Sequence, residues 1–336
     1  MEAPKITKFA SAVPVGEYGK DRLEYFYETM LKIRKFEKTV EEKFLGGEIP
    51  GFVHLYIGEE AVATGVMSNM SYKDYIESTH RGHGHTIAKG ADLNIMMAEI
   101  FGKKTGYCKG KGGSMHIASF EIGMLGANGV VGGGYNLAAG AALAQKMQGK
   151  KDISAVFFGD GASNRGTFHE AANFASVWKL PLLFVCEMNE YASTTPYRAA
   201  TSVADIAQRA YGYDMPGVIV EDGNDVLSVH EAAKKLIEYI RAGNGPAFLE
   251  CKTYRVKGHF VGDPEKYRTR EEVQRNIDTR DPLMLFEKKV TEAGIFAHNE
   301  LTAIQARVDG QIADALKFAK ESPEPDASEL FKDLYV

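Results

Sequence analysis

The sequence predicts an α/β protein built on a doubly wound parallel sheet, with helical extensions at its N- and C-terminal ends. Two short apolar runs, ISAVFF at 153–158 and LPLLFVCE at 180–187, are bounded by turn residues and have the length of buried strands. The segment between them, 165–179, carries apolar residues at helical spacing. Strand, glycine-rich turn, helix and strand in this order make up a βαβ unit of a parallel sheet.

The other elements surround this unit. Apolar residues at helical spacing predict helices over 21–45, 59–70, 92–102 and 226–243. A glycine-rich break ends the first of these helices, and a strand within 246–256 follows the last. From Asp281 onward the pattern is helical again.

The domain organisation follows from the absence of a convincing linker or internal repeat. We expect a single domain over 1–336, with a helical N-terminal arm over 1–50 and a helical C-terminal extension over 281–336.

Composition excludes several classes of function. A net charge of −5 gives no basic footprint for nucleic acid. No apolar run is long enough to span a bilayer, and the first twenty residues lack the apolar core of a secretory signal. Three widely spaced cysteines (Cys108, Cys186 and Cys251) have no metal-ligand spacing and are expected to be reduced thiols in the core. We therefore expect a cytoplasmic globular protein.

The glycine-rich turn GDGASNRG at 159–166 carries the most informative chemistry. Its glycines permit a sharp turn, and the helix N-terminus beyond it favours phosphate. The carboxylate of Asp160 would repel a phosphate unless a divalent cation such as Mg²⁺ lay between them. Asn189 and Tyr191 leave the next strand at the same sheet edge and offer an amide oxygen and a backbone carbonyl.

Other interpretations of these residues remain open at this point. GDG alone is also typical of an ordinary tight turn. GDGASNRG lacks the third glycine of the dinucleotide fingerprint, which disfavours a Rossmann-type nucleotide enzyme. KGKGGS at 109–114 lacks both the glycine spacing and the terminal GK[ST] of a phosphate loop.

The turn and several other sequence blocks resemble those of a known family. GDG followed by Asn189 is similar to the thiamine-diphosphate motif, as found in alpha subunits of the two-chain 2-oxo-acid and acetoin dehydrogenases. Six further blocks resemble the same subunits in the same order: GFVHLYIGEEAV, STHRGHGHTIAKG, GYCKGKGGSMHI, GANGVVGGG, GPAFLECKTYRVKGH and DPEKYRTREEV. Together they cover nearly the whole chain, which makes coincidence a poor explanation.

The resemblance implies a cofactor site of thiamine diphosphate and Mg²⁺. It places Asp160, Asn189 and the Tyr191 carbonyl on the metal. The resemblance also implies that the diphosphate is contacted by backbone groups of Gly161 and Ala162 and by the side chains of Arg81, His80 and His259. Around the aminopyrimidine it places Gly129 and Val131. Val131 would hold the cofactor bent. One departure is Met188, where the family usually has asparagine, and we expect it to alter packing and not the metal site.

Histidines are the implied catalytic residues. His259 would reach the diphosphate and the reacting centre, and His54 would lie on the substrate side. His83 is a further candidate, although a lone histidine is more often a satisfied, half-buried ring.

The resemblance also implies partners. In this family, the glutamate that activates the pyrimidine ring lies on a separate domain, and nothing in this chain resembles a second such domain. We therefore expect a beta subunit that supplies the glutamate and forms a heterotetramer with this chain. We also expect a lipoyl-bearing acyltransferase, which receives the two-carbon unit derived from a small-molecule substrate.

Within this family, the sequence also indicates a class of substrate. STHRGHGH, GMLGANG and Phe260 are more similar to the acetoin-cleaving branch than to the pyruvate branch. A pyruvate or branched-chain 2-oxo-acid dehydrogenase alpha subunit is the alternative, and a non-catalytic protein with the thiamine fold is a third possibility.

Overall fold

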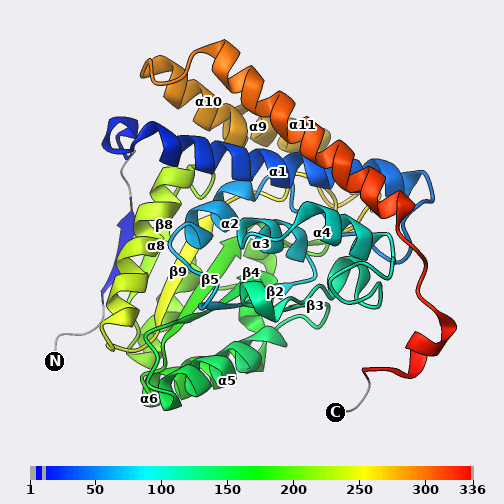
Figure 1. The fold of residues 1–336 in the computed structure, drawn as a ribbon. Coiled ribbons are helices and arrows are strands. Elements are labelled where there is room, and N and C mark those ends of the chain that lie inside the picture. The colour runs from blue at the N-terminus through cyan, green and yellow to red at the C-terminus, as the bar shows by residue number, and fades with distance from the viewer. Residues whose placement is uncertain (1–4, 10–12, 334–336) are drawn as a thin grey trace.

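The computed structural model describes residues 5–9 and 13–333. Its centre is a seven-stranded sheet in which every neighbouring pair of strands is parallel (Figure 1). From one edge to the other, its strands are β1 (Ile6–Phe9), β8 (Gly217–Val220), β9 (Ala247–Lys252), β5 (Leu182–Met188), β4 (Ser154–Gly159), β2 (Tyr75–Thr79) and β3 (Met124–Asn128). The prediction of a parallel α/β sheet is therefore confirmed.

Helices cover both faces of the sheet. Side chains of a strand alternate between the two faces, so each face has an apolar cluster of its own. Ala155 and Phe157 of β4 join the larger apolar cluster, while Val156 and Phe158 join the smaller one. The larger cluster includes α1 (Lys20–Leu45), α2 (Glu60–Met67), α4 (Leu93–Ile100) and α8 (Val226–Arg241). The smaller cluster includes α5 (Gly134–Met147) and α6 (Gly166–Val177), on the opposite face in Figure 1.

The C-terminal helices form an additional outer layer. After α9 (Arg270–Arg280), α10 (Pro282–Glu292) and α11 (His298–Glu321) pack on the outer side of α1 (Figure 1). Asp281 starts α10 by accepting hydrogen bonds from the Leu283 and Met284 N–H groups, with Pro282 at the first helical position. None of the described helices is long and apolar enough to cross a membrane.

Residues 5–50 differ from the predicted helical N-terminal arm. Residues 6–9 form β1, which pairs with β8 at the sheet edge, and only residues 20–45 form the long helix. The sequence does not mark β1 because ITKF is short and its side chains are at most half-buried, so backbone pairing holds it. Residues 1–4, 10–12 and 334–336 of the predicted terminal extensions lie outside the described residues.

Three shorter strands also escaped prediction. β2 and β3 mix apolar side chains with polar or small ones, in YIEST and MLGAN, and β8 has only four residues. The thiol prediction holds in part: Cys186 and Cys251 are buried free thiols, while Cys108 is only half-buried.

Candidate active site

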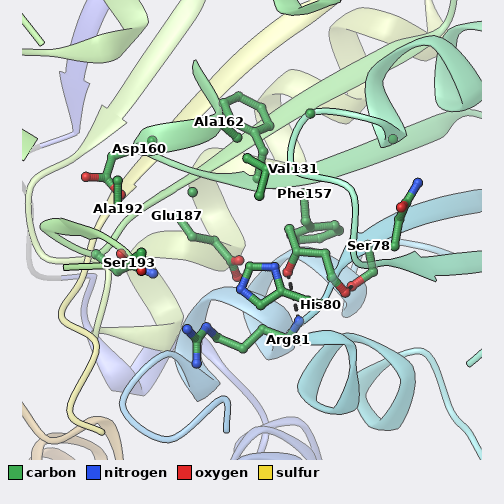
Figure 2. Close-up of a pocket in the computed structure, with 18 of the residues that line it drawn as sticks. Ser78, His80, Arg81, Val131, Phe157, Asp160, Ala162, Glu187, Ala192 and Ser193 are labelled. Carbon is green, nitrogen blue, oxygen red and sulfur yellow. Dashed lines mark hydrogen bonds between the residues drawn. The ribbon is translucent and has the colours of Figure 1, made fainter. Parts of the chain in front are cut away.

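A cavity of about 280 Å³ lies at the carboxyl ends of the central strands (Figure 2). The chain leaves β2 for β3 on one side and β4 for β5 on the other, which makes the β2–β4 boundary the switch point of the sheet. Open α/β sheets bind ligands at this point. Nine residues predicted from the sequence line the cavity: His80, Arg81, Val131, Asp160, Gly161, Ala162, Asn189, Tyr191 and His259.

Two oxygen atoms in the cavity wall lack partners. Oδ2 of Asp160 and Oδ1 of Asn189 are buried and accept no hydrogen bond from the described residues. Burial, only partly offset by the Gly161 N–H and the Arg255 charge, raises the pKa of Asp160 to about 6. Unpartnered buried oxygens are costly, and carboxylate and amide oxygens are the ligands that Mg²⁺ prefers. The observed donor set therefore fits a hard divalent cation.

The Asn189 amide is oriented by Glu59, a residue that the sequence reasoning did not single out. Nδ2 of Asn189 donates to both Glu59 carboxylate oxygens at 3.2 Å, which turns Oδ1 away from Glu59. Glu59 is fully buried just before α2. Burial, followed by the nearby Glu187 charge, raises the pKa of Glu59 to about 8.

The Tyr191 carbonyl is held by Arg255, which the sequence reasoning also missed. Arg255 is buried three residues after β9 and donates to the carbonyls of Tyr191 at 3.2 Å and Ser193 at 2.8 Å. It also donates to the Tyr267 hydroxyl at 2.7 Å. The one sequence signal for Arg255 was its position just after a predicted strand. Its role becomes visible only in the sheet, where that strand, β9, lies beside β5.

The turn at Gly161 needs a residue without a side chain. A Cβ added there would lie 2.4 Å from the Cβ of Ala192. Ala192 belongs to β6 (Tyr191–Ala192), which forms a small hairpin with β7 (Thr195–Pro196). Figure 2 shows Asp160 beside Ala192, with His80 and Arg81 farther across the cavity.

Arg81 supplies positive charge on the opposite wall. It begins α3 (Gly82–Ala88), and its guanidinium donates to the carbonyls of Leu55 at 2.8 Å and His259 at 3.0 Å. Burial lowers the pKa of Arg81 to about 10, so the side chain stays charged at neutral pH. A fixed, charged guanidinium is suited to an anionic ligand.

Three histidine rings pack together beside Arg81. The ring centroids lie 4.7 Å apart for His54 and His80, 5.0 Å for His54 and His259, and 5.2 Å for His80 and His259. His80 and His259 line the cavity, whereas His54 lies behind them. Burial first and the Arg81 charge second lower the pKa of all three, to about 3 for His54, about 2 for His80 and about 4 for His259. All three are neutral at pH 7.

The structure does not bring His83 and Gly129 to the cavity lining. His83 is fully buried, with Nδ1 2.9 Å from a Glu37 carboxylate oxygen and Nε2 3.1 Å from the Ser114 carbonyl. Both of its ring nitrogens are thus occupied within the core. Gly129 is exposed one residue after β3.

Glu187 is a further lining residue that was not predicted. Near the end of β5, it accepts a hydrogen bond from the Tyr56 hydroxyl, and Nε2 of His85 lies 2.9 Å from the same oxygen. Met188, the departure from the expected asparagine, packs in the smaller apolar cluster.

Fold and cavity together define an α/β protein whose candidate binding site lies at the switch point of a parallel sheet. The family profile of the dehydrogenase E1 component matches residues 28–328, and the chain belongs to this family. Members of this family are oxidoreductases that depend on thiamine diphosphate.

Similar proteins agree with this assignment. The chain is 52% identical over 320 residues to the alpha subunit of an acetoin:2,6-dichlorophenolindophenol oxidoreductase from Bacillus subtilis, covering 94% of each chain. It is 49% identical over 317 residues to the subunit of the same name from Cupriavidus necator, covering 94% of this chain and 95% of the relative. It is 40% identical over 322 residues to the pyruvate dehydrogenase E1 component subunit alpha of Rhizobium meliloti, covering 96% and 92%.

Proposed function

We propose that this chain is the alpha subunit of a thiamine-diphosphate-dependent dehydrogenase first component that cleaves acetoin. The two-carbon unit would pass to a lipoyl-bearing acyltransferase. The observation that carries the proposal is the pair of unpartnered oxygens on Asp160 and Asn189, which face one cavity at the switch point. The relatives from B. subtilis and C. necator, both named for acetoin, support the choice of substrate.

In this proposal Asp160, Asn189 and the Tyr191 carbonyl hold Mg²⁺. Arg81, His80 and His259 contact the diphosphate together with backbone groups of Gly161 and Ala162, and Val131 borders the aminopyrimidine. Gly129 is left out because it does not line the cavity. When bound, thiamine diphosphate supplies the electron sink for breaking a bond next to a carbonyl. Arg255 already binds the Tyr191 carbonyl and keeps it at the cavity.

The neutral histidines support acetoin as substrate. Acetoin has no carboxylate, and its cleavage to an aldehyde requires a base for its hydroxyl proton. Nδ1 of buried His54 has no partner among the described residues, and this ring contacts both His80 and His259. We propose His259, which lines the cavity, as the substrate-side group that accepts and returns this proton, and His54 as the ring that positions it. His83 is left out because core groups contact both of its ring nitrogens.

A beta subunit is the proposed partner, and it would supply the activating glutamate. The wall of the cavity at Val130 and Val131 is open, with these side chains 65% and 46% exposed. Exposed apolar side chains at the edge of a binding cavity are typical of a surface that a partner covers. The alpha-subunit names of the relatives also imply an assembly with other subunits.

The experiment is a rate comparison of the assembly with its beta subunit on acetoin, pyruvate and branched 2-oxo acids, using an artificial electron acceptor. We expect acetoin to give the highest kcat/KM, and Asp160→Ala to abolish Mg²⁺-dependent cofactor binding in calorimetry. A preference for pyruvate would establish the second candidate, a pyruvate dehydrogenase alpha subunit, which the R. meliloti relative favours. Turnover by the isolated chain would refute the shared active site.

A further inference from the structure

His54, His80 and His259 form a cluster with the composition of a transition-metal site. One ring nitrogen of each lies within 4.8 Å of one ring nitrogen of both others. The three come from different segments: the loop before α2, the end of β2 and the loop after β9. The fold, and not local sequence, brings them together.

A buried ring nitrogen of the cluster is available for a ligand. Imidazole binds a metal through a ring nitrogen that carries no proton. The buried Nδ1 of His54 has no hydrogen-bond partner among the described residues.

We propose that His54, His80 and His259 bind one transition-metal dication of the Zn²⁺ type, which blocks the cofactor cavity while thiamine diphosphate is absent. Three imidazoles and an open fourth position are a common arrangement for zinc. This site is distinct from the oxygen cage of Asp160, Asn189 and Tyr191, because nitrogen ligands select zinc or cobalt and oxygen ligands select magnesium.

The geometry requires only small movements. Zinc–nitrogen bonds of about 2.0 Å in a tetrahedron place the nitrogens roughly 3.3 Å apart. The nitrogens therefore have to approach by at most about 1.5 Å from the observed limit of 4.8 Å. His259 can supply this shift because it lies in a loop, where its N–H donates to Asp263 at 2.8 Å. The buried charge of Arg81 opposes a dication at this position, and the metal has to overcome that repulsion.

The blocking effect rests on the proposed function, since it assumes that the cavity takes the cofactor diphosphate. His80 and His259 belong both to the cluster and to the cavity wall. A metal between them would occupy the space beside Arg81 that the diphosphate needs. Cofactor uptake would then wait for the metal to leave.

The test uses the cofactor-free assembly with its beta subunit, saturated with Mg²⁺, and Co²⁺ as the probe. Tetrahedral cobalt with nitrogen ligands absorbs strongly in the visible range, whereas octahedral cobalt with oxygen ligands absorbs weakly. We expect one strongly absorbing cobalt per alpha chain, displaced by Zn²⁺. His80→Tyr should weaken this binding more than about 100-fold, since it removes a direct ligand.

The matched control is His169→Tyr, the same change at an exposed histidine that contacts Tyr213 instead of the cluster. It should leave the cobalt spectrum unchanged. Weak absorption only, or equal binding by wild type and His80→Tyr, would refute the metal site. A zinc-loaded wild type that takes up thiamine diphosphate as fast as the metal-free protein would refute the blocking role.

The proposed function is tested separately. Calorimetry of the metal-free assembly with Mg²⁺ and thiamine diphosphate reports cofactor binding without any contribution from the cluster. Normal cofactor binding without the cobalt signal would overturn the cluster site alone. A cobalt signal without cofactor binding would overturn the proposed function, and the blocking role with it, but not the metal site.

Discussion

Replacing Asp160 with asparagine removes a charge that the empty cavity disfavours and that the proposed cation needs. The carboxyl is buried, its Oδ2 has no hydrogen-bond partner in the part of the chain that the structure describes, and its pKa is raised from 3.8 to about 6. Because the folded protein holds this proton more tightly than the unfolded chain, ionising Asp160 destabilises the fold. The shift of about 2 units corresponds to about 3 kcal/mol at about 1.4 kcal/mol per unit.

The sign and the pH window follow from these two values. The penalty is absent below the unfolded pKa of 3.8, grows as pH rises, and is complete above the folded pKa of about 6. Asp160→Asn should therefore stabilise the cofactor-free protein by up to about 3 kcal/mol at pH 8, and by about half of that at pH 5. Mg²⁺ with thiamine diphosphate should stabilise the wild type strongly and the variant hardly at all.

The assay is denaturant unfolding of the cofactor-free assembly at pH 5 and pH 8, with and without both ligands. Asp205→Asn is the matched control, because Asp205 pairs with Lys252 at 2.7 Å and these contacts lower its pKa. The same change there should destabilise the protein at both pH values. A less stable Asp160→Asn protein at pH 8, or a gain that does not shrink at pH 5, would refute the reasoning.

Three further predictions concern the same region. Glu59→Ala removes both acceptors of the Asn189 amide N–H and so lets the amide turn over, which should weaken Mg²⁺ binding about 10- to 100-fold in calorimetry; an unchanged affinity would show that Glu59 does not orient the ligand. Mg²⁺ affinity should fall about tenfold per pH unit below the Asp160 pKa of about 6, and a flat titration profile would contradict the metal assignment. Gly84→Ala would put a Cβ 2.1 Å from Cδ1 of buried Tyr56 and should cost about 1–3 kcal/mol or more in unfolding free energy, so equal stability would mean that this ring can move.

The sequence predicted those elements whose apolar residues form a clear pattern, either a continuous run or a helical spacing. β4, β5 and β9 are buried strands of six or seven residues, so their apolar runs stand out. β2 is different: its buried Glu77 and Ser78 give it a polar composition, although it lies inside the sheet. Its strand character comes from pairing with β3 and β4, which a single segment cannot reveal.

Those site residues could be predicted whose charge conflicts with their surroundings unless a ligand is bound. Asp160 in a phosphate-type turn led us to expect a cation, and both Asp160 and Asn189, at the same sheet edge, line the cavity. Glu59 and Arg255 could not be found in this way, because their roles are contacts with Asn189 and Tyr191 across 130 and 64 residues of sequence. Only the parallel order of the strands makes those residues neighbours.

The long sequence separations within the cavity also affect how the protein folds. Its wall is formed by residues that lie within the stretches 78–81, 128–135, 156–162 and 187–193, although not every residue of these stretches lines it, and by Arg255 and His259. Contacts between such distant stretches form late, after the entropy of closing large loops has been lost. A partly folded chain therefore offers the cofactor no complete set of ligands. The cofactor should slow unfolding of the finished subunit while leaving its folding rate unchanged.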